Sequence, residues 1–246
     1  MVTWSDIVPH PSVSLITGRR GSGKSTLAYH LLEEFSRQRD LVACVMGLPS
    51  EKQHLLPKGY VLAQEPSEFP ERACILVDEG SLSFHARRSH SPLNVLMDNM
   101  VSLSRQREQT LIVISHFMRK LDINIVTELD ALLMKEPSLL HNRMERAEVK
   151  DMTREAFTAF RRLSGDRRSF SYVISEGFQG MMQNPPPSFW SEDLSKAWRG
   201  VVVGARSVEE DQRPAVFEVF TCTKCGRPAY MMDAHCEYCG EAKPGI

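Results

Sequence analysis

The chain has 246 residues, of which 42% are hydrophobic and 25% are charged, and its formal net charge at pH 7 is −1. This length fits one α/β domain with a small appendage, and the composition is that of an ordinary globular protein. The near-neutral charge excludes a strong non-specific attraction to nucleic acid, so contacts with a polyanion must come from local clusters.

Short apolar, β-branched segments recur along the first half of the chain, and each is predicted as a strand. They cover residues 12–17, 41–46, 60–64, 73–79, 110–115 and 130–135. Apolar residues at helical spacing follow the first strand from Leu27 to Phe35, and a second amphipathic helix begins at Ser91 and runs to Val101. Continuous apolar strands that alternate with helices favour an α/β fold with a mainly parallel sheet and helices on both faces.

The second half of the chain has a weaker pattern. Residues 157–175 predict a helix, a turn and a strand, and the proline-rich stretch 183–190 leads into a short helix. The domain organisation expected is a core over residues 1–140, an extension and linker over 141–215, and a small module over 216–246 that holds four of the six cysteines, spaced as in a zinc ribbon.

The first predicted strand runs directly into "GRRGSGKS", which has the Gly-x-x-x-x-Gly-Lys-Ser pattern of a phosphate-binding loop. Its glycines let successive backbone N–H groups turn toward an anion, and the following helix directs its positive end at the phosphates. Lys24 is expected to contact the β and γ phosphates, and Ser25 to bind Mg²⁺. The residues predicted to bind ATP here are Gly18, Gly21, Ser22, Gly23, Lys24, Ser25 and Thr26.

Two acids end the strand over residues 73–79. Asp78 is expected to bind Mg²⁺ together with Ser25. Glu79 is placed to orient or deprotonate a water that attacks the γ phosphate, which favours hydrolysis over transfer to a small-molecule acceptor. The alternative interpretation is a solvated acid at a strand end.

The loop, Lys24, the Asp-Glu pair and a polar residue at the end of the next strand resemble the additional-strand, catalytic-glutamate class of P-loop ATPases. In that class the strand after the Asp-Glu strand lies between it and the loop strand. The resemblance therefore implies that Ser115 and His116 emerge beside the γ phosphate, where His116 would sense whether ATP is intact. The alternative is a structural histidine.

Two arginines precede this strand at a spacing that resembles the HerA/FtsK superfamily of ring-shaped DNA-pumping ATPases, and especially its compact viral, phage and zonular-occludens-toxin-like members. The resemblance covers roughly residues 12–135. It implies that Arg105, with Arg107 as the fallback, reaches into a neighbouring subunit's site as an arginine finger. The alternative is a pair of exposed helix-end cations. His116 departs from the family, where Gln or Asn is more usual.

Four of the six cysteines form two Cys-x-x-Cys-Gly pairs near the C-terminus. Four thiolates in this spacing are typical of a closed, structural Zn²⁺ site whose metal supplies the folding energy of a short module. The two remaining cysteines, Cys44 and Cys74, lie in apolar strands and are expected to be buried thiols. The predicted ligands are Cys222, Cys225, Cys236 and Cys239.

The function predicted from these features is ATP hydrolysis by a ring-forming DNA translocase, with a hexamer as the expected ring, that packages or transfers a viral or mobile-element genome. Its DNA contacts would be sequence-independent, with the basic segments 85–90 and 161–169 as candidates against a solvated-surface alternative. No apolar run approaches the roughly 20 residues that span a bilayer, and the first ten residues lack the pattern of a secretory signal. We therefore expect a cytoplasmic or virion-associated protein.

Two other functions fit parts of the sequence. One is a nucleotide-dependent assembly or secretion ATPase that acts on a capsid or other protein partner through its zinc ribbon, which the near-neutral charge favours. The other is a small-molecule kinase, which Glu79 and the two arginines disfavour. Salt-sensitive DNA binding would separate the first from a DNA motor, and phosphate release without an acceptor would exclude the second.

Overall fold

The structure is a computed structural model that describes residues 2–78, 102–118, 121, 126–200, 219–222, 224–225, 228–230 and 239. Four predicted features lie outside these residues: Glu79, the basic segment 85–90, the helix from Ser91 to Val101, and Cys236. The chain divides into two compact units, Met1–Val201 and Val202–Ile246, which are described separately.

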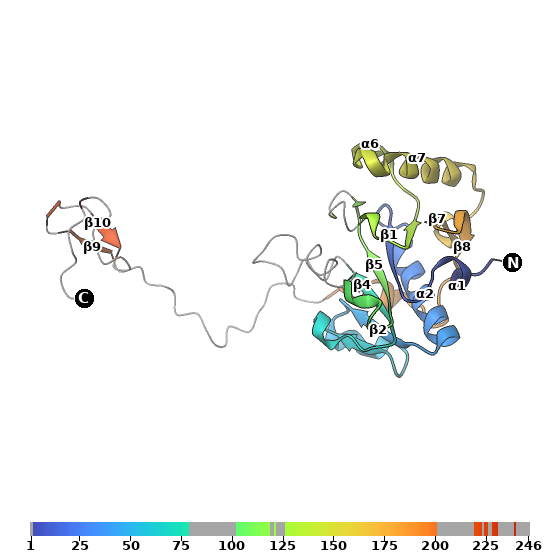
Figure 1. The fold of residues 1–246 in the computed structure, drawn as a ribbon, viewed down its shortest axis with the longest axis horizontal. Helices are drawn as coiled ribbons and strands as arrows, with labels where there is room; N and C mark the ends of the chain where they lie inside the picture. The colour runs from blue at the N-terminus through green and yellow to red at the C-terminus, as the bar shows by residue number, and fades with distance from the viewer. Residues whose placement is uncertain are drawn as a thin grey trace. The chain divides into compact units, whose positions relative to one another are not determined.

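The larger unit is built on one mixed sheet (Figure 1). Within the described residues the sheet has eight strands in the order β3-β2-β4-β5-β1-β6-β7-β8. Every strand predicted in the first half of the chain is present. The strands are β1 (Ser12–Thr17), β2 (Val42–Met46), β3 (Val61–Ala63), β4 (Ala73–Asp78), β5 (Gln109–Ile114), β6 (Ala131–Met134), β7 (Phe170–Ser175) and β8 (Phe178–Gln183).

The strand that follows the Asp-Glu strand lies between it and the loop strand, as the family resemblance implies. β5 pairs in parallel with β4 on one side and with β1 on the other. The register aligns Ile114 with both Asp78 and Ile16, so these three strands end at one edge of the sheet. The predicted α/β fold with an additional central strand is therefore confirmed.

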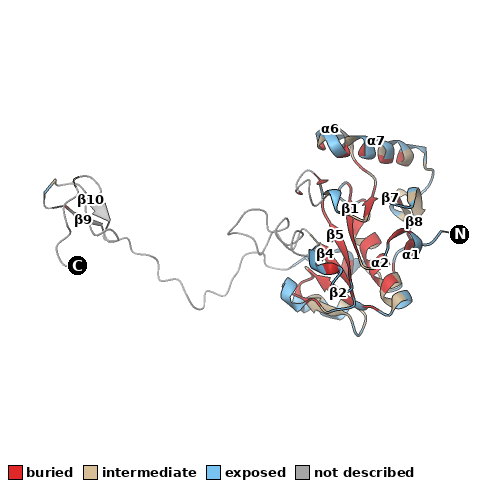
Figure 2. Cartoon of the chain, viewed as in Figure 1, coloured by how far each residue is buried: buried red, intermediate tan, exposed pale blue. Residues whose placement is uncertain are grey.

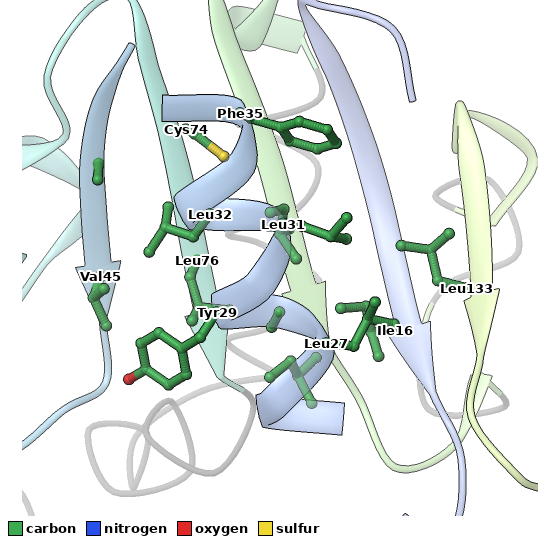
Figure 3. Close-up of a cluster of buried hydrophobic side chains, with 14 of the residues drawn as sticks. Ile16, Leu27, Tyr29, Leu31, Leu32, Phe35, Val45, Cys74, Leu76 and Leu133 are labelled. Atoms are coloured by element: carbon green, nitrogen blue, oxygen red, sulfur yellow. The ribbon is translucent and has the colours of Figure 1, made fainter. Parts of the chain in front are cut away.

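The helices cover both faces of the sheet, as predicted. Helix α2 (Lys24–Arg39) packs on one face, where Leu27, Leu31 and Phe35 point toward the strands (Figure 3). Helix α7 (Ala147–Arg162) buries one stripe of residues in the hydrophobic cluster of the other face and leaves its outer side exposed (Figure 2). Neighbouring residues of β1 alternate between the two clusters, because successive side chains of a strand point to opposite faces.

The remaining helices are short. They are α1 (Trp4–Ile7), α6 (Leu139–Met144), α8 (Glu192–Ser195) and the 3₁₀ turns η1 (Ser50–Leu55), η2 (Pro66–Glu68) and η4 (Arg167–Ser169). The strands β7 and β8 come from the second half of the chain. β7 pairs antiparallel with β6, and β8 pairs antiparallel with β7. No helix among the described residues is both long enough and apolar enough to cross a bilayer.

The smaller unit contains a two-stranded antiparallel ladder of β9 (Val219–Thr221) and β10 (Pro228–Tyr230). Its register pairs Phe220 with Ala229. The first cysteine pair lies between these strands, so the ladder holds the turn that carries Cys222 and Cys225.

Candidate functional site

The phosphate-binding loop joins β1 to α2, and two of its glycines are required by geometry. Gly18 has φ 141° and packs so closely on Lys135 that a Cβ atom would lie 2.8 Å from both Cβ and O of Lys135. Gly23 has φ 90° and occupies the N-cap of α2 in the left-handed region, which strains any residue with a side chain. The loop therefore has little freedom to accept substitution at either position.

Lys24 is buried over the curve of this loop. Its Nζ atom donates to the carbonyl oxygens of Gly18, at 2.9 Å, and Arg19, at 3.1 Å. The Ser22 hydroxyl donates to the same Arg19 carbonyl at 2.7 Å. The ammonium group thus already lies inside the loop, at the N-terminus of a helix whose dipole favours an anion.

A cavity of about 740 Å³ opens over the loop and collects most of the predicted nucleotide-binding residues. Gly18 and Ser22 are part of the phosphate-binding loop but do not line the cavity. The residues of the predicted site that do line it are Gly21, Gly23, Lys24, Ser25, Thr26, Asp78 and His116. A volume of this size holds a nucleotide-sized ligand, since ligand pockets measure roughly 300–1,000 Å³.

Asp78 and His116 reach this cavity from the ends of adjacent strands. Asp78 is the last residue of β4, and His116 follows β5 by two residues with its side chain exposed. Ser115 is buried, and its hydroxyl donates to the Phe117 carbonyl at 3.2 Å. Of the Ser-His pair, only His116 therefore lines the cavity.

The segment after β5 is clamped by α6 and the residue that follows it. The buried His141 donates from Nε2 to the His116 carbonyl at 2.8 Å, and its ring stacks on Phe117 at a centroid distance of 4.3 Å. The Met118 N–H donates to Glu145 at 3.1 Å. The position of His116 therefore depends on α6, an element that the sequence did not predict.

A buried lysine, Lys135, packs against the phosphate-binding loop. Lys135 follows β6, has no solvent exposure, and donates to the carbonyl oxygens of Arg168, at 2.6 Å, and Phe170, at 2.5 Å, and to Asn184 Oδ1 at 3.0 Å. Burial lowers the pKa of Lys135 to about 7, and the Asp166 carboxylate opposes this shift. Both protonation states retain N–H donors for these oxygens.

Beside Lys135, an ion-pair network ties the loop to the basic segment 161–169. Glu136 accepts from Arg19 Nε at 3.0 Å and from Arg167 Nη1 at 2.6 Å. Burial alone would raise the pKa of Glu136, but the hydrogen bonds from Arg167 and Arg19 lower it overall. Arg167 is thus occupied within the chain, whereas Arg168 lines the cavity.

The segment after β8 completes the wall of the cavity. Asn184, Pro186, Trp190, Ser195 and Trp198 line it from this side. Trp190 packs against Tyr29 of α2 with ring centroids 6.0 Å apart, which holds the segment on the nucleotide-binding helix. Burial, and secondarily the Asp78 charge, raises the pKa of Tyr29 far above its ordinary range, so its hydroxyl stays protonated.

The two arginines before β5 do not lie at this cavity in the same chain. Arg105 is 77% exposed, and its Nη2 atom lies 3.8 Å from Asp130 Oδ1. Arg105 lies near the N-terminal end of β5, whereas the loop lies at the C-terminal ends of the strands. The length of β1, roughly 20 Å, separates the two. Arg107 instead donates to the Phe69 carbonyl at 2.7 Å and so has a structural contact.

The cysteines of the smaller unit cluster as a metal site would require. The sulfur atoms of Cys222, Cys225 and Cys239 all lie within 4.8 Å of one another, and those of Cys222 and Cys239 are 3.7 Å apart. Sulfurs bound at about 2.3 Å to a tetrahedral Zn²⁺ are about 3.8 Å apart, so this spacing fits the metal. N–H groups of Cys225 and Lys224 lower the pKa of Cys222 to about 6, which favours a thiolate.

Similar structures share the fold of the larger unit. No protein-family model matches the sequence, and no curated protein matches it. B204, the DNA-packaging ATPase from Sulfolobus turreted icosahedral virus, superposes with a TM-score of 0.50 at 13% identity over 72% of this chain and 98% of B204. EssC ATPases 2 and 3 from Geobacillus thermodenitrificans give a TM-score of 0.49 at 9% identity over 77% of this chain and 42% of EssC. The chain has the P-loop ATPase fold.

Within this P-loop ATPase fold, the predicted resemblance to compact viral packaging ATPases is confirmed at the level of the fold. The sequence patterns did not indicate a place at this cavity for Lys135, for Arg168 or for the segment after β8. Lys135 ends an apolar strand, a pattern that also fits an exposed cation, and nothing in the sequence indicates that β7 would bury it. Two of its acceptors are backbone carbonyl groups, which leave no sequence signal.

We expect Lys135→Met to lower the free energy of unfolding by about 3 kcal/mol, because it leaves several buried acceptors without a donor. Urea unfolding followed by tryptophan fluorescence measures this in the larger unit, which holds all three tryptophans. The native pKa of about 7 lies below the ordinary 10.5, so the unfolded chain binds more protons between these values and the contribution of Lys135 grows as the pH rises above about 7. The matched control is the exposed Lys58→Met, and an equally small loss in both variants would contradict this role.

Proposed function

We propose that this chain hydrolyses ATP and couples hydrolysis to the movement of DNA, as one subunit of a ring. The observation that carries the proposal is the single cavity in which Lys24, Ser25, Asp78 and His116 meet at the ends of β1, β4 and β5. The fold shared with B204, described as a DNA-packaging ATPase, supports the same function.

Each residue of the predicted catalytic and phosphate-binding set would have a role in this reaction. Lys24 and the loop N–H groups bind the phosphates, and Glu79 orients the attacking water. His116 hydrogen-bonds the γ phosphate or the water and so distinguishes ATP from ADP. Ser25 and Asp78 would hold Mg²⁺, which supplies charge neutralisation at the β and γ oxygens when it is bound. The two groups line one cavity, so the residues present fit the ion.

Arg105 would act on the site of a neighbouring subunit. Its exposure and its place at the edge of the sheet opposite the loop are consistent with a contact made outside its own chain. A planar guanidinium placed on the transferring phosphoryl group stabilises its developing charge, and such arginines raise rates roughly 10³–10⁵-fold. A hexamer is the ring we propose, with DNA in its channel and contacts mainly to phosphates.

The smaller unit would be a zinc ribbon with Cys222, Cys225, Cys236 and Cys239 as ligands. The described sulfur positions support this assignment, and the fourth ligand comes from the spacing of the sequence. Such a ribbon offers a docking surface, so a capsid or other protein partner is the second candidate substrate. It is favoured by the net charge of −1, which gives little general attraction to DNA.

The first expected outcome is ATP hydrolysis that rises with protein concentration and is stimulated by long double-stranded DNA. Steady-state phosphate release measures it, and DNA binding should weaken steeply as salt is raised, because phosphate contacts release counterions. Lys24→Ala should abolish hydrolysis, and Glu79→Gln should retain ATP binding while losing turnover. Hydrolysis that ignores both DNA and concentration would overturn the motor and favour the protein partner.

The second expected outcome concerns Arg105. Arg105→Ala should reduce turnover at least about a hundredfold, since trans arginines contribute roughly 10³–10⁵. Mixing it with Lys24→Ala should restore part of the activity, because an intact loop beside a Lys24→Ala subunit then receives the arginine of that neighbour. Arg72→Ala is the matched control, as Arg72 lies at the same sheet edge and is 65% exposed. If the mixture stays inactive while Arg105→Ala alone is impaired, the trans role is wrong.

The third expected outcome is about one Zn²⁺ per chain, measured by elemental analysis. Cys222→Ser should lose the metal and Cys44→Ser should keep it. After chelation at neutral pH, iodoacetamide should label only the four ribbon cysteines. Cys44 and Cys74 should stay unlabelled because burial raises the pKa of Cys44 to about 12 and that of Cys74 still further. Labelling of the ribbon cysteines before chelation would contradict the metal site.

A further inference from the structure

Arg168 is a cation on the wall of the nucleotide cavity that the reaction described above does not use. Its side chain is exposed, and its guanidinium group makes no hydrogen bond or ion pair with any residue in the part of the chain that the structure describes. The adjacent Arg167 differs, because it is paired with Glu136 at 2.6 Å. Of these two neighbours, only Arg168 is available to a ligand of the cavity.

The backbone of Arg168 is held firmly although its side chain is not. Its N–H donates to Asp166 Oδ1 at 3.0 Å, and its carbonyl accepts from Lys135 Nζ at 2.6 Å and from Asn184 Nδ2 at 3.3 Å. Asp166, the acidic group on this side of the cavity, is therefore engaged by the turn itself. These bonds fix the Cα–Cβ direction of Arg168 and involve no atom of its guanidinium group.

This backbone position lies directly beside the phosphate-binding loop. A Cβ atom built on Gly23 would be 3.6 Å from the Arg168 Cβ and 3.3 Å from its carbonyl oxygen. Gly23 is the N-cap of α2, whose first N–H groups face the anion. The Arg168 side chain thus starts within a few ångströms of the place where the phosphate chain would lie.

The strand order decides which end of the nucleotide Arg168 faces. Asp78 ends β4 and His116 follows β5, both on one side of β1. Arg168 precedes β7, which lies beyond β6 on the other side of β1. Asp78, which would hold Mg²⁺ at the β and γ oxygens, is on the β4 side. Arg168 is therefore across the loop from the transferred phosphoryl group.

We propose that Arg168 binds the non-transferred phosphates, α and β, of the nucleotide in its own subunit. This inference rests on the proposed nucleotide site and adds to it a residue that binds ATP and ADP alike. An interaction of equal strength in the ground and transition states lowers KM without changing kcat. Arg168 would therefore affect KM, whereas Arg105 would affect kcat.

The test measures the affinity of the full-length protein for ADP and for the non-hydrolysable analogue AMPPCP, both with Mg²⁺, by titration calorimetry. Arg168→Ala should weaken both ligands about tenfold, the loss expected for one charge-assisted hydrogen bond at a partly exposed site. Arg168→Lys should recover part of the loss. KM for ATP should rise by a similar factor, with kcat unchanged.

The control is Arg154→Ala, which removes an exposed arginine of α7 that is 61% exposed and does not line the cavity. Thermal unfolding followed by tryptophan fluorescence should give the same midpoint for all variants, because Lys135 bonds to the Arg168 backbone and not to its side chain. Unchanged affinities, or loss for AMPPCP but not ADP, would overturn the inference. If the unsubstituted protein binds neither ligand, the proposed function itself fails.

Discussion

The buried ammonium group of Lys135 is the interaction on which the nucleotide end of this molecule depends. Its Nζ atom donates to the Arg168 and Phe170 carbonyl groups, while the Cβ atom and the backbone of Lys135 pack against Gly18 of the loop. A cation in the interior is costly unless oxygen atoms surround it, and here they come from segments far apart in the sequence. The loop therefore owes its shape to β7 and β8 as well as to its own glycines.

The residues that line the cavity come from both sides of β1 in the sheet. On one side of β1, the ends of β4 and β5 present Asp78 and His116, for which we propose metal binding and sensing of the terminal phosphate. On the other side, the segments around β6, β7 and β8 present main-chain anchors and Arg168. Insertion of β5 beside β1 is what brings the first set next to the loop, and the antiparallel hairpin brings the second.

The central features could be predicted from sequence because local patterns determine them. The apolar run of β1, the glycines after it and the helical spacing from Leu27 to Phe35 each carry a direct signal. The supporting contacts could not be predicted in this way, because Lys135 and His141 act through bonds to backbone carbonyl groups that any residue provides. β8 has no clear sequence signal, because its residues are only partly buried and include Gly180, so it lacks a strong apolar pattern. The sequence indicates only a basic segment here, because it does not show that Arg167 pairs with Glu136 while Arg168 lines the cavity.

The hydrogen bond from His141 to the His116 carbonyl connects α6 to the segment after β5, which lines the cavity. His141 belongs to α6. A displacement of the segment after β5 would therefore either break this hydrogen bond and the stacking of Phe117 on His141, or move α6 as well. The same short helix exposes Leu139 and Leu140, at 61% and 63%, to the outside. A movement of the strand end that kept this bond would therefore also move two exposed apolar side chains on the outside of the molecule.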